Sequence, residues 1–292
     1  MRSPVAVVAC ILLATACASP EREAEGPQRK ETIVAVTEGG TLLRFNAGQP
    51  QRVTEVGRIT GLQPNEGLMG IDYRVARGVL FGLGSSGRVY TIDAKTAQAT
   101  AVGAPLAMPL MGGEFGFDFN PAVDRIRIVS NTGQNLRAHP DTGAAVDGNP
   151  NSDGVQGDGT LAYAAGDRNA GQSPRVVGAA YTYNKQNEKI TTNYALDATT
   201  GALVTLGTRE GVTPAVSPNT GQLFTVGSLG VPRFQRAGFD IADVDNAAFA
   251  ALNHDGAAAT RLYTIDLGTG KATFIGTVGA ELLRGIAVEP LI

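Results

Sequence analysis

A repeated hairpin motif constrains the fold of this chain more than any other feature of its sequence. Three stretches align without a gap: RVYTIDAKTAQATAVG (88–103), TNYALDATTGALVTLG (192–207) and RLYTIDLGTGKATFIG (261–276). In each, apolar residues alternate with polar ones, and an Asp then opens a turn that contains a Thr three residues later. This pattern predicts a β-hairpin. Two weaker copies occupy 42–57 and 135–146, so five copies are visible.

A second motif, glycine, apolar, Asp, apolar, precedes the hairpins at Gly70, Gly116 and Gly238. Each copy opens a strand and is followed by another strand. With its hairpin, each unit then has four strands in roughly 45 residues, which is the size of a propeller blade.

The other two blades are less regular. In the fourth, TLAYAAGD (160–167) and VVGAAYTYN (176–184) are expected to be the first and second strands. In the fifth, RGIAVEP (284–290) would supply the first strand and TIVAVTEGG (32–40) the second. The two ends of the chain would then meet within one blade, which removes the open edges of the ring.

We therefore expect an all-β fold: a β-propeller of four-stranded antiparallel blades, closed by pairing of the N- and C-terminal strands. The segment 208–236 contains one convincing strand, LFTVGS, and is an insertion or a degenerate blade. Five blades are expected, with six as the alternative. A content of 38 Gly and 15 Pro suits short strands joined by tight turns.

The N-terminus predicts export. One Arg precedes an apolar run that is too short to span a bilayer, and the small residues before Cys17 resemble a bacterial lipobox, whose Cys is acylated. We expect a signal peptide (1–16), a lipidated Cys with a flexible tether (17–31) and a single propeller domain (32–292). The alternative is cleavage at an A-x-A pattern, which would give a secreted or soluble periplasmic protein.

The N-terminus predicts the cellular location, and the charge distribution excludes nucleic acid as a partner. A lipid anchor would bind the protein to the membrane of the bacterial cell envelope. The residue after Cys17 is Ala rather than Asp, the pattern typical of lipoproteins that reach the outer membrane. The net charge is −3 and the basic residues are scattered singly, so no nucleic acid is expected as a partner.

Several motifs also carry a resemblance to a known family. The stretches concerned are NPAVDRIRIVSNTGQNLR, DGTLAYAAGD, SPRVVGAAYT, NTGQLFTVGSLGV and GFDI. They resemble the bacterial domain-of-unknown-function family numbered 4394, over essentially all of 33–290. The resemblance implies an envelope-associated or secreted propeller-like domain, and it implies no activity or ligand.

Familiar catalytic motifs are missing from the sequence. It contains no G-x-S-x-G elbow and no H-E-x-x-H, and neither His139 nor His254 has a plausible nucleophile beside it. We therefore expect a non-enzymatic protein that binds a small-molecule, glycan or protein ligand through loops at one propeller face. The alternative is a Ca²⁺-dependent, lactonase-like hydrolase that uses axial carboxylates, and a purely structural role is a third reading.

The first candidate metal site is formed by Asp72, Asp118 and Asp240. They hold equivalent positions on the first strands of three blades, so ring closure would gather them at one mouth of the channel. Ala162 and Ala287 are expected at the corresponding positions of the other two blades. Oxygen ligands favour Ca²⁺ over Zn²⁺. The alternative is that each Asp caps turn backbone or pairs with a neighbouring Arg.

The second candidate lies in the loop DGNPNSDGVQGDG. Asn149, Asn151 and Asp153 have the spacing of the first half of a calcium loop, and Asp158 follows. The bidentate Glu that completes such a loop is missing. A solvated turn rich in Asn, Asp and Gly is the alternative.

Overall fold

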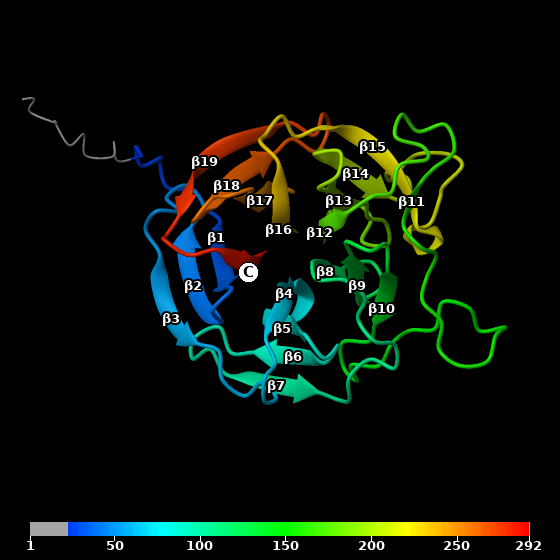
Figure 1. Cartoon of the computed structure of the whole chain (residues 1–292), viewed down its shortest axis with the longest axis horizontal. Coiled ribbons are helices and arrows are strands. Elements are labelled where there is room, and N and C mark those ends of the chain that lie inside the picture. Colours follow the sequence, from blue (N-terminus) through cyan, green and yellow to red (C-terminus); the bar gives the residue numbers. More distant parts are fainter. Residues whose placement is uncertain (1–22, 292) are drawn as a thin grey trace, which may run out of the picture.

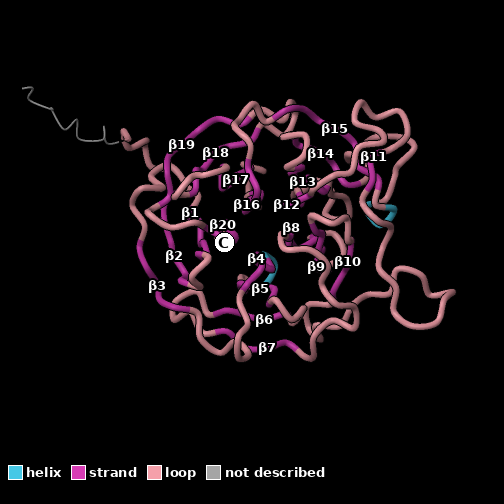
Figure 2. Tube along the Cα trace, in the orientation of Figure 1, coloured by secondary structure: helices cyan, strands magenta, loops and turns pink. Residues whose placement is uncertain are grey.

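A computed structural model of the chain describes residues 23–291. Five β-sheets surround a central axis, with the strands of each sheet stacked from the axis outward (Figure 1). The expected five-bladed propeller is confirmed. Two short 3-10 helices, Val75–Arg77 and Pro218–Thr220, are the helical elements of the described chain (Figure 2). Within 23–291 no helix is long and apolar enough to cross a membrane. The predicted signal peptide and Cys17 lie outside the described residues.

Three blades have the expected four antiparallel strands. Blade 1 contains β20 (Leu283–Val288), β1 (Thr32–Thr37), β2 (Thr41–Asn46) and β3 (Thr54–Arg58), from the axis outward. Blade 2 contains β4 (Leu68–Arg74), β5 (Val79–Gly84), β6 (Val89–Ile92) and β7 (Ala99–Val102). Blade 5 contains β16 (Phe234–Ile241), β17 (Ala248–His254), β18 (Thr260–Ile265) and β19 (Ala272–Val278).

The two ends of the chain close the ring inside blade 1, which is the blade described as the fifth in the sequence analysis. This closure is the expected one. Strand β1 pairs antiparallel with β20, with Ile33 opposite Val288 and Ala35 opposite Ile286. All four of these side chains are buried. The closure therefore combines ladder hydrogen bonds with a packed core, and β20 covers the edge of β1 that would otherwise be open.

Blades 3 and 4 differ from the four-strand rule. Blade 3 has only three strands, and its fourth is reduced to a single bridge between Ala138 and Ala145. Blade 4 has five, because β11 pairs in parallel with β15 at its outer edge. The remaining strands of the two blades are β8 (Phe115–Asn120), β9 (Arg125–Ser130), β10 (Asn135–Ala138), β11 (Ala162–Tyr163), β12 (Val176–Tyr181), β13 (Asn193–Asp197), β14 (Ala202–Leu206) and β15 (Gln222–Ser228).

The expected strand order of blade 4 was wrong. Its innermost strand is β12, so Ala180 rather than Ala162 is equivalent to the axial Asp residues. The hairpin at 192–207 forms the second and third strands of this blade, and the segment 208–236 completes it with β15. That segment therefore completes blade 4, ends in the first residues of β16 in blade 5, and contributes no sixth blade.

A ring of five glycines brings the inner strands together at the axis. A Cβ atom on Gly116 would lie 2.6 Å from the nitrogen of Ala179, and one on Gly238 would lie 2.8 Å from the nitrogen of Ile286. Around the ring, the nearest atom belongs each time to the residue after the next blade's glycine. The five are Gly70, Gly116, Gly178, Gly238 and Gly285. The inner strands therefore approach one another so closely that side chains have no room at this level.

The hydrophobic core is divided among the five interfaces between neighbouring blades. Each interface has its own cluster of buried side chains; Ile33 and Phe45 of blade 1, for example, pack with Phe249 and Leu262 of blade 5. Each blade is therefore stabilised mainly by its two neighbours, so completing the ring stabilises every blade.

The described part of the expected tether is not free of the propeller. Glu23 accepts hydrogen bonds from both the backbone N–H and the hydroxyl of Thr277, each at 2.7 Å. The guanidinium of Arg29 stacks 5.3 Å from the ring centroid of Phe249. Residues 23–31 therefore lie along blades 1 and 5, because their charged side chains find partners there.

Candidate functional site

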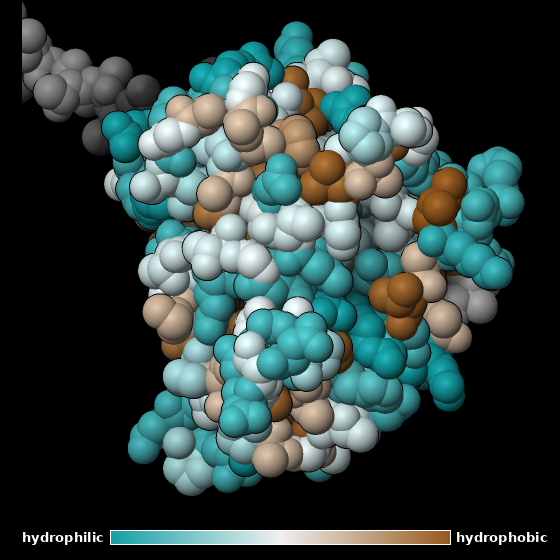
Figure 3. All heavy atoms as spheres, turned by 90° about the vertical axis from the view of Figure 1, so that its right-hand side faces the viewer, coloured by the Kyte–Doolittle hydropathy of each residue, from teal (hydrophilic) through white to brown (hydrophobic). Residues whose placement is uncertain are grey.

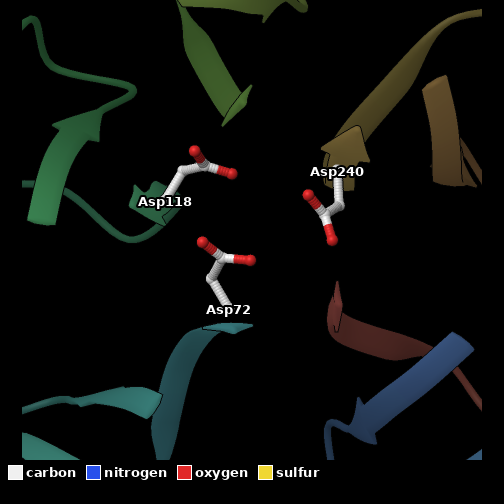
Figure 4. A group of neighbouring side chains, drawn as sticks. All are labelled: Asp72, Asp118 and Asp240. Carbon is white, nitrogen blue, oxygen red and sulfur yellow. The ribbon is translucent and has the colours of Figure 1, made fainter. Parts of the chain in front are cut away.

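Three axial carboxylates meet near the centre of the ring. Asp72, Asp118 and Asp240 lie on β4, β8 and β16, two residues after the ring glycines, and their side chains point toward one another (Figure 4). One oxygen from each lies within 4.8 Å of the others, which would allow the three to hold a metal ion. Their exposed fractions are 4%, 3% and 6%. The group, called the axial carboxylates below, is therefore buried and convergent.

Each axial carboxylate also joins its blade to the next one. One oxygen accepts a hydrogen bond from a backbone N–H of the neighbouring inner strand. The pairs are Phe119 N–H to Asp72 at 2.7 Å, Tyr181 N–H to Asp118 at 3.0 Å and Val288 N–H to Asp240 at 2.5 Å. Sequence reasoning offered backbone capping as the alternative to a metal site. The structure shows such bonds, but they run between blades rather than within a turn.

Blades 4 and 1 have Ala180 and Ala287 in place of the axial Asp, and their inner strands donate instead to Asp118 and Asp240 of the preceding blades. The inner strands of the blades that follow them, 5 and 2, therefore receive no carboxylate from that side. In blade 5 the N–H of Ile241 instead donates to its own Asp240 at 2.6 Å. Three carboxylates thus satisfy N–H groups around a ring of five inner strands, which explains why an incomplete set suffices.

The electrostatics of the axial carboxylates require a compensating charge. Burial raises the pKa of all three, and repulsion between them raises the pKa of Asp72 and Asp118 further. The pKa of Asp240 rises to about 7. In the described chain none of the three accepts a hydrogen bond from an Arg or Lys. Arg74, which follows Asp72 by two residues, pairs with Asp124 and Asp141 instead. The cluster must take up protons or a cation.

Ion pairs close one end of the axis. Arg236 of β16 donates through Nε and Nη2 to the two carboxylate oxygens of Glu114, at 2.6 and 2.7 Å, and also pairs with Glu38. Arg284 of β20 adds a third contact to Glu114 at 3.3 Å. The glycine ring follows directly, where the cavity is only about 10 Å³. The axial carboxylates are therefore shut off from this side.

The opposite end of the axis is open. A cavity of about 530 Å³, called the mouth pocket below, lies where the inner strands end. Tyr183 lines it, and both burial and the negative charge of the axial carboxylates raise the pKa of its phenol. Tyr183 thus lies within electrostatic reach of them. The complete lining is Arg74, Val75, Ala76, Arg77, Phe119, Asn120, Pro121, Asp124, Tyr183, Asn184, Lys185, Glu188, Ile190 and Asp243.

The Asn- and Asp-rich loop is organised differently from a calcium loop. The side chain of Asp158 is 2% exposed and accepts hydrogen bonds from the guanidinium groups of Arg127 and Arg137. Asn149 accepts a hydrogen bond from the N–H of Asn151, as in a polar turn. Within the described chain, the axial carboxylates are the one group of three or more His, Cys, Asp or Glu with metal-binding geometry. These contacts favour the polar turn over a metal site that includes Asp153 and Asp158.

The loop connects blade 3 to the outer edge of blade 4. It projects at the right of Figure 1 and faces the viewer in Figure 3, where its surface is largely hydrophilic. Asp158 fixes its inner end against β9 and β10 through the two arginines. Sequence reasoning overlooked Arg127 and Arg137. The available signal was a charged residue at the centre of RIRIV, a strand otherwise apolar enough to be buried.

The comparisons with known proteins agree with the resemblance seen in the sequence. A family model described as "Domain of unknown function (DUF4394)" matches residues 41–287. The chain belongs to this family. No curated protein matches the DUF4394 chain.

Solved structures similar to this DUF4394 protein share little sequence with it. A nidogen/laminin complex has a TM-score of 0.46 at 11% identity, covering 89% of this chain and 98% of that one. A protein of unknown function from Bacteroides thetaiotaomicron has a TM-score of 0.45 at 14% identity, covering 90% and 65%. TolB from Acinetobacter baumannii has a TM-score of 0.44 at 9% identity, covering 89% and 67%.

Proposed function

We propose that this DUF4394 protein is a non-enzymatic, lipid-anchored envelope protein whose propeller binds a ligand in the mouth pocket. The observation that carries the proposal is the difference between the two ends of the axis. Ion pairs around Glu114 fill one end, whereas the other opens into a cavity of about 530 Å³. Ligand sites commonly have a volume of roughly 300–1,000 Å³ and are formed by loops on a rigid scaffold.

The lining of the mouth pocket supports a ligand with both apolar and polar parts. Pro121 and Ile190 offer apolar surface, and Lys185 and Glu188 offer charges of both signs. A small molecule, or one unit of a glycan or peptide, suits this volume and chemistry.

A cation on the axial carboxylates belongs to the same proposal. Calcium takes six to eight oxygen ligands at roughly 2.3–2.6 Å, and three oxygens within 4.8 Å of one another suit such a shell. The closed end of the axis leaves the mouth pocket as the side from which water or a ligand oxygen would complete the shell. Calcium would also replace the protons that the buried carboxylates otherwise need.

The convergent carboxylates are also the observation that favours the alternative, a Ca²⁺-dependent hydrolase. That reaction needs a general base near the cation. The mouth pocket has no histidine in its lining, and of its three carboxylates Asp124 is paired with Arg74. Turnover of a lactone that disappears in Asp243→Asn or Glu188→Gln would favour the hydrolase over the binding protein.

The envelope anchor rests on Cys17, six residues before Glu23. Six residues span at most about 20 Å when extended. Because residues 23–31 lie along blades 1 and 5, we propose that the anchor holds this rim of the propeller near the membrane. Such an orientation would leave the mouth pocket open to solutes.

The binding proposal is tested with soluble Cys17→Ser protein and a defined panel of sugars, amino acids and short peptides, using ligand-observed NMR. Ile190→Arg fills the mouth pocket, and Val212→Arg is the matched control, since the two residues are 41% and 46% exposed and Val212 does not line the pocket. We expect compounds that bind the parent to lose binding in Ile190→Arg alone. Binding that persists in Ile190→Arg, or a panel without a single binder, would contradict the proposal.

A further inference from the structure

A second cavity, called the interblade pocket below, lies between blades 3 and 4. Its volume is about 410 Å³. It is lined by Asn120, Val123, Arg125, Ile126, Arg127, Arg137, Val146, Tyr181, Ser217, Pro218 and Asn219. The lining includes three arginines and no carboxylate, which is unusual in a chain with more acidic than basic residues.

Arg127 is the most deeply buried charge of this pocket, with 2% of its side chain exposed. Its Nε donates to the hydroxyl of Tyr181 at 3.2 Å, and its Nη2 to Asn219 at 2.6 Å. Its Nη1 donates to Asn135 at 2.7 Å and Asp158 at 2.6 Å. The guanidinium is therefore fixed in place before any ligand arrives, which lowers the entropic cost of binding.

The positive charge around the interblade pocket exceeds the negative charge. The single carboxylate of Asp158 is shared by Arg127 and Arg137, and Arg125 adds a third guanidinium. Backbone N–H groups of Gln156 and Asn149 lower the pKa of the Asp147 carboxyl, and the nearby guanidinium of Arg137 lowers it further. At least one positive charge is left without a partner, and a partly buried cation without a counter-charge is unfavourable.

Several donors of the pocket lack an acceptor within the described chain. They are Nη1 of Arg137 and Nε and Nη2 of Arg125. The hydroxyl of Tyr181 accepts from Arg127 and donates to no acceptor, although the side chain is 1% exposed. Planar guanidinium donors match the two oxygens of a carboxylate. An anion would supply the acceptors that these donors lack.

We propose that the interblade pocket binds a small organic acid. Its carboxylate would pair with Arg125 and Arg137 and accept a hydrogen bond from Tyr181. The lining also includes the apolar side chains of Val123, Val146 and Pro218, which suit the hydrocarbon part of such an acid better than they suit a bare phosphate or sulfate ion. The proposal stands apart from the mouth pocket, which shares only Asn120 with this lining.

Calorimetric titration with benzoate, phosphate and sulfate, at an ionic strength held constant with chloride, tests the proposal on soluble Cys17→Ser protein. We expect benzoate to bind most tightly. Arg125→Gln and Arg137→Gln should each weaken it by tenfold or more, because a charge-assisted hydrogen bond contributes about that factor or more. Arg58→Gln, which removes an exposed charge outside the pocket, should leave binding unchanged.

Arg125→Gln leaves the ion pairs of Asp158 intact, so the test does not depend on the folding of Arg137→Gln. Absence of benzoate binding, tighter binding of phosphate or sulfate, or an equal loss in Arg58→Gln would overturn the proposal. Ile190→Arg in the mouth pocket should bind benzoate normally, which separates this result from the test of the proposed function.

Discussion

Protonation of the axial carboxylates should make the protein more stable in weak acid than at neutral pH. Their folded pKa values are raised, so the folded state binds more protons than the unfolded chain above the ordinary Asp pKa of about 3.9. Stability must then fall as the pH rises through the folded pKa. This is the reverse of the usual behaviour of ion-paired carboxylates.

The magnitude follows from Asp240, whose pKa is about 7 in the folded protein. A rise of roughly three pH units from the unfolded value corresponds to about 4 kcal/mol, of which about 3 kcal/mol is lost between pH 5 and pH 8. Asp72 and Asp118 change the stability in the same direction.

Urea unfolding followed by circular dichroism, in the presence of chelator, measures this slope. Asp118→Asn/Asp240→Asn is the comparison, because Asn keeps an acceptor for the backbone N–H groups and does not titrate. We expect the parent to lose about 3 kcal/mol or more between pH 5 and pH 8 and the variant to lose much less. Glu114, whose pKa is also about 7, contributes equally to both proteins. Equal slopes, or a parent that gains stability over this range, would refute the reasoning.

Three further predictions concern the anchor, the ring closure and the glycine ring. Cys17→Ser should move the protein from the membrane fraction to the soluble fraction, and failure of labelled palmitate to mark the parent would contradict the anchor. Deletion of 284–292 removes all of β20 except Leu283 and should leave an insoluble or molten protein; cooperative unfolding at an unchanged midpoint would count against closure. Gly116→Ala should cost about 1–3 kcal/mol by urea unfolding, because its Cβ would meet Ala179, whereas Gly67→Ala has open space and should cost little; equal costs would argue against the glycine ring.

Much of the fold could be predicted because local signals repeat along the chain. The hairpin copies and the glycine motifs at Gly70, Gly116 and Gly238 identified the strands of most blades. The predicted strand order of blade 4 was wrong because Ala180 replaces the Asp that marks an inner strand. VVGAAY therefore lacked the Gly–apolar–Asp pattern. The short β11 has the same apolar alternation as a true inner strand, yet it pairs in parallel at the outer edge.

The candidate site was also predictable only in part from the sequence. The repeat alignment placed Asp72, Asp118 and Asp240 at equivalent positions, and ring geometry then brought them together. No local pattern reveals that Asp158 meets Arg127 and Arg137, because the contacts require the loop to fold back on β9 and β10. The interblade and mouth pockets likewise depend on how neighbouring blades approach one another, which the sequence of one blade does not encode.

Calcium binding by the axial carboxylates is the most direct test of the proposed site. Titration calorimetry at pH 8 on chelator-treated protein should show one Ca²⁺ per chain, and Asp118→Asn/Asp240→Asn should abolish it. Replacing Asn149, Asn151 and Asp153 with Ala in the loop should leave the binding intact, because Asn149 accepts a hydrogen bond within a polar turn and the convergent carboxylates of the described chain are the axial ones. No heat of binding in the parent would contradict the cation site, and loss of binding only in the loop variant would place the site in the loop instead.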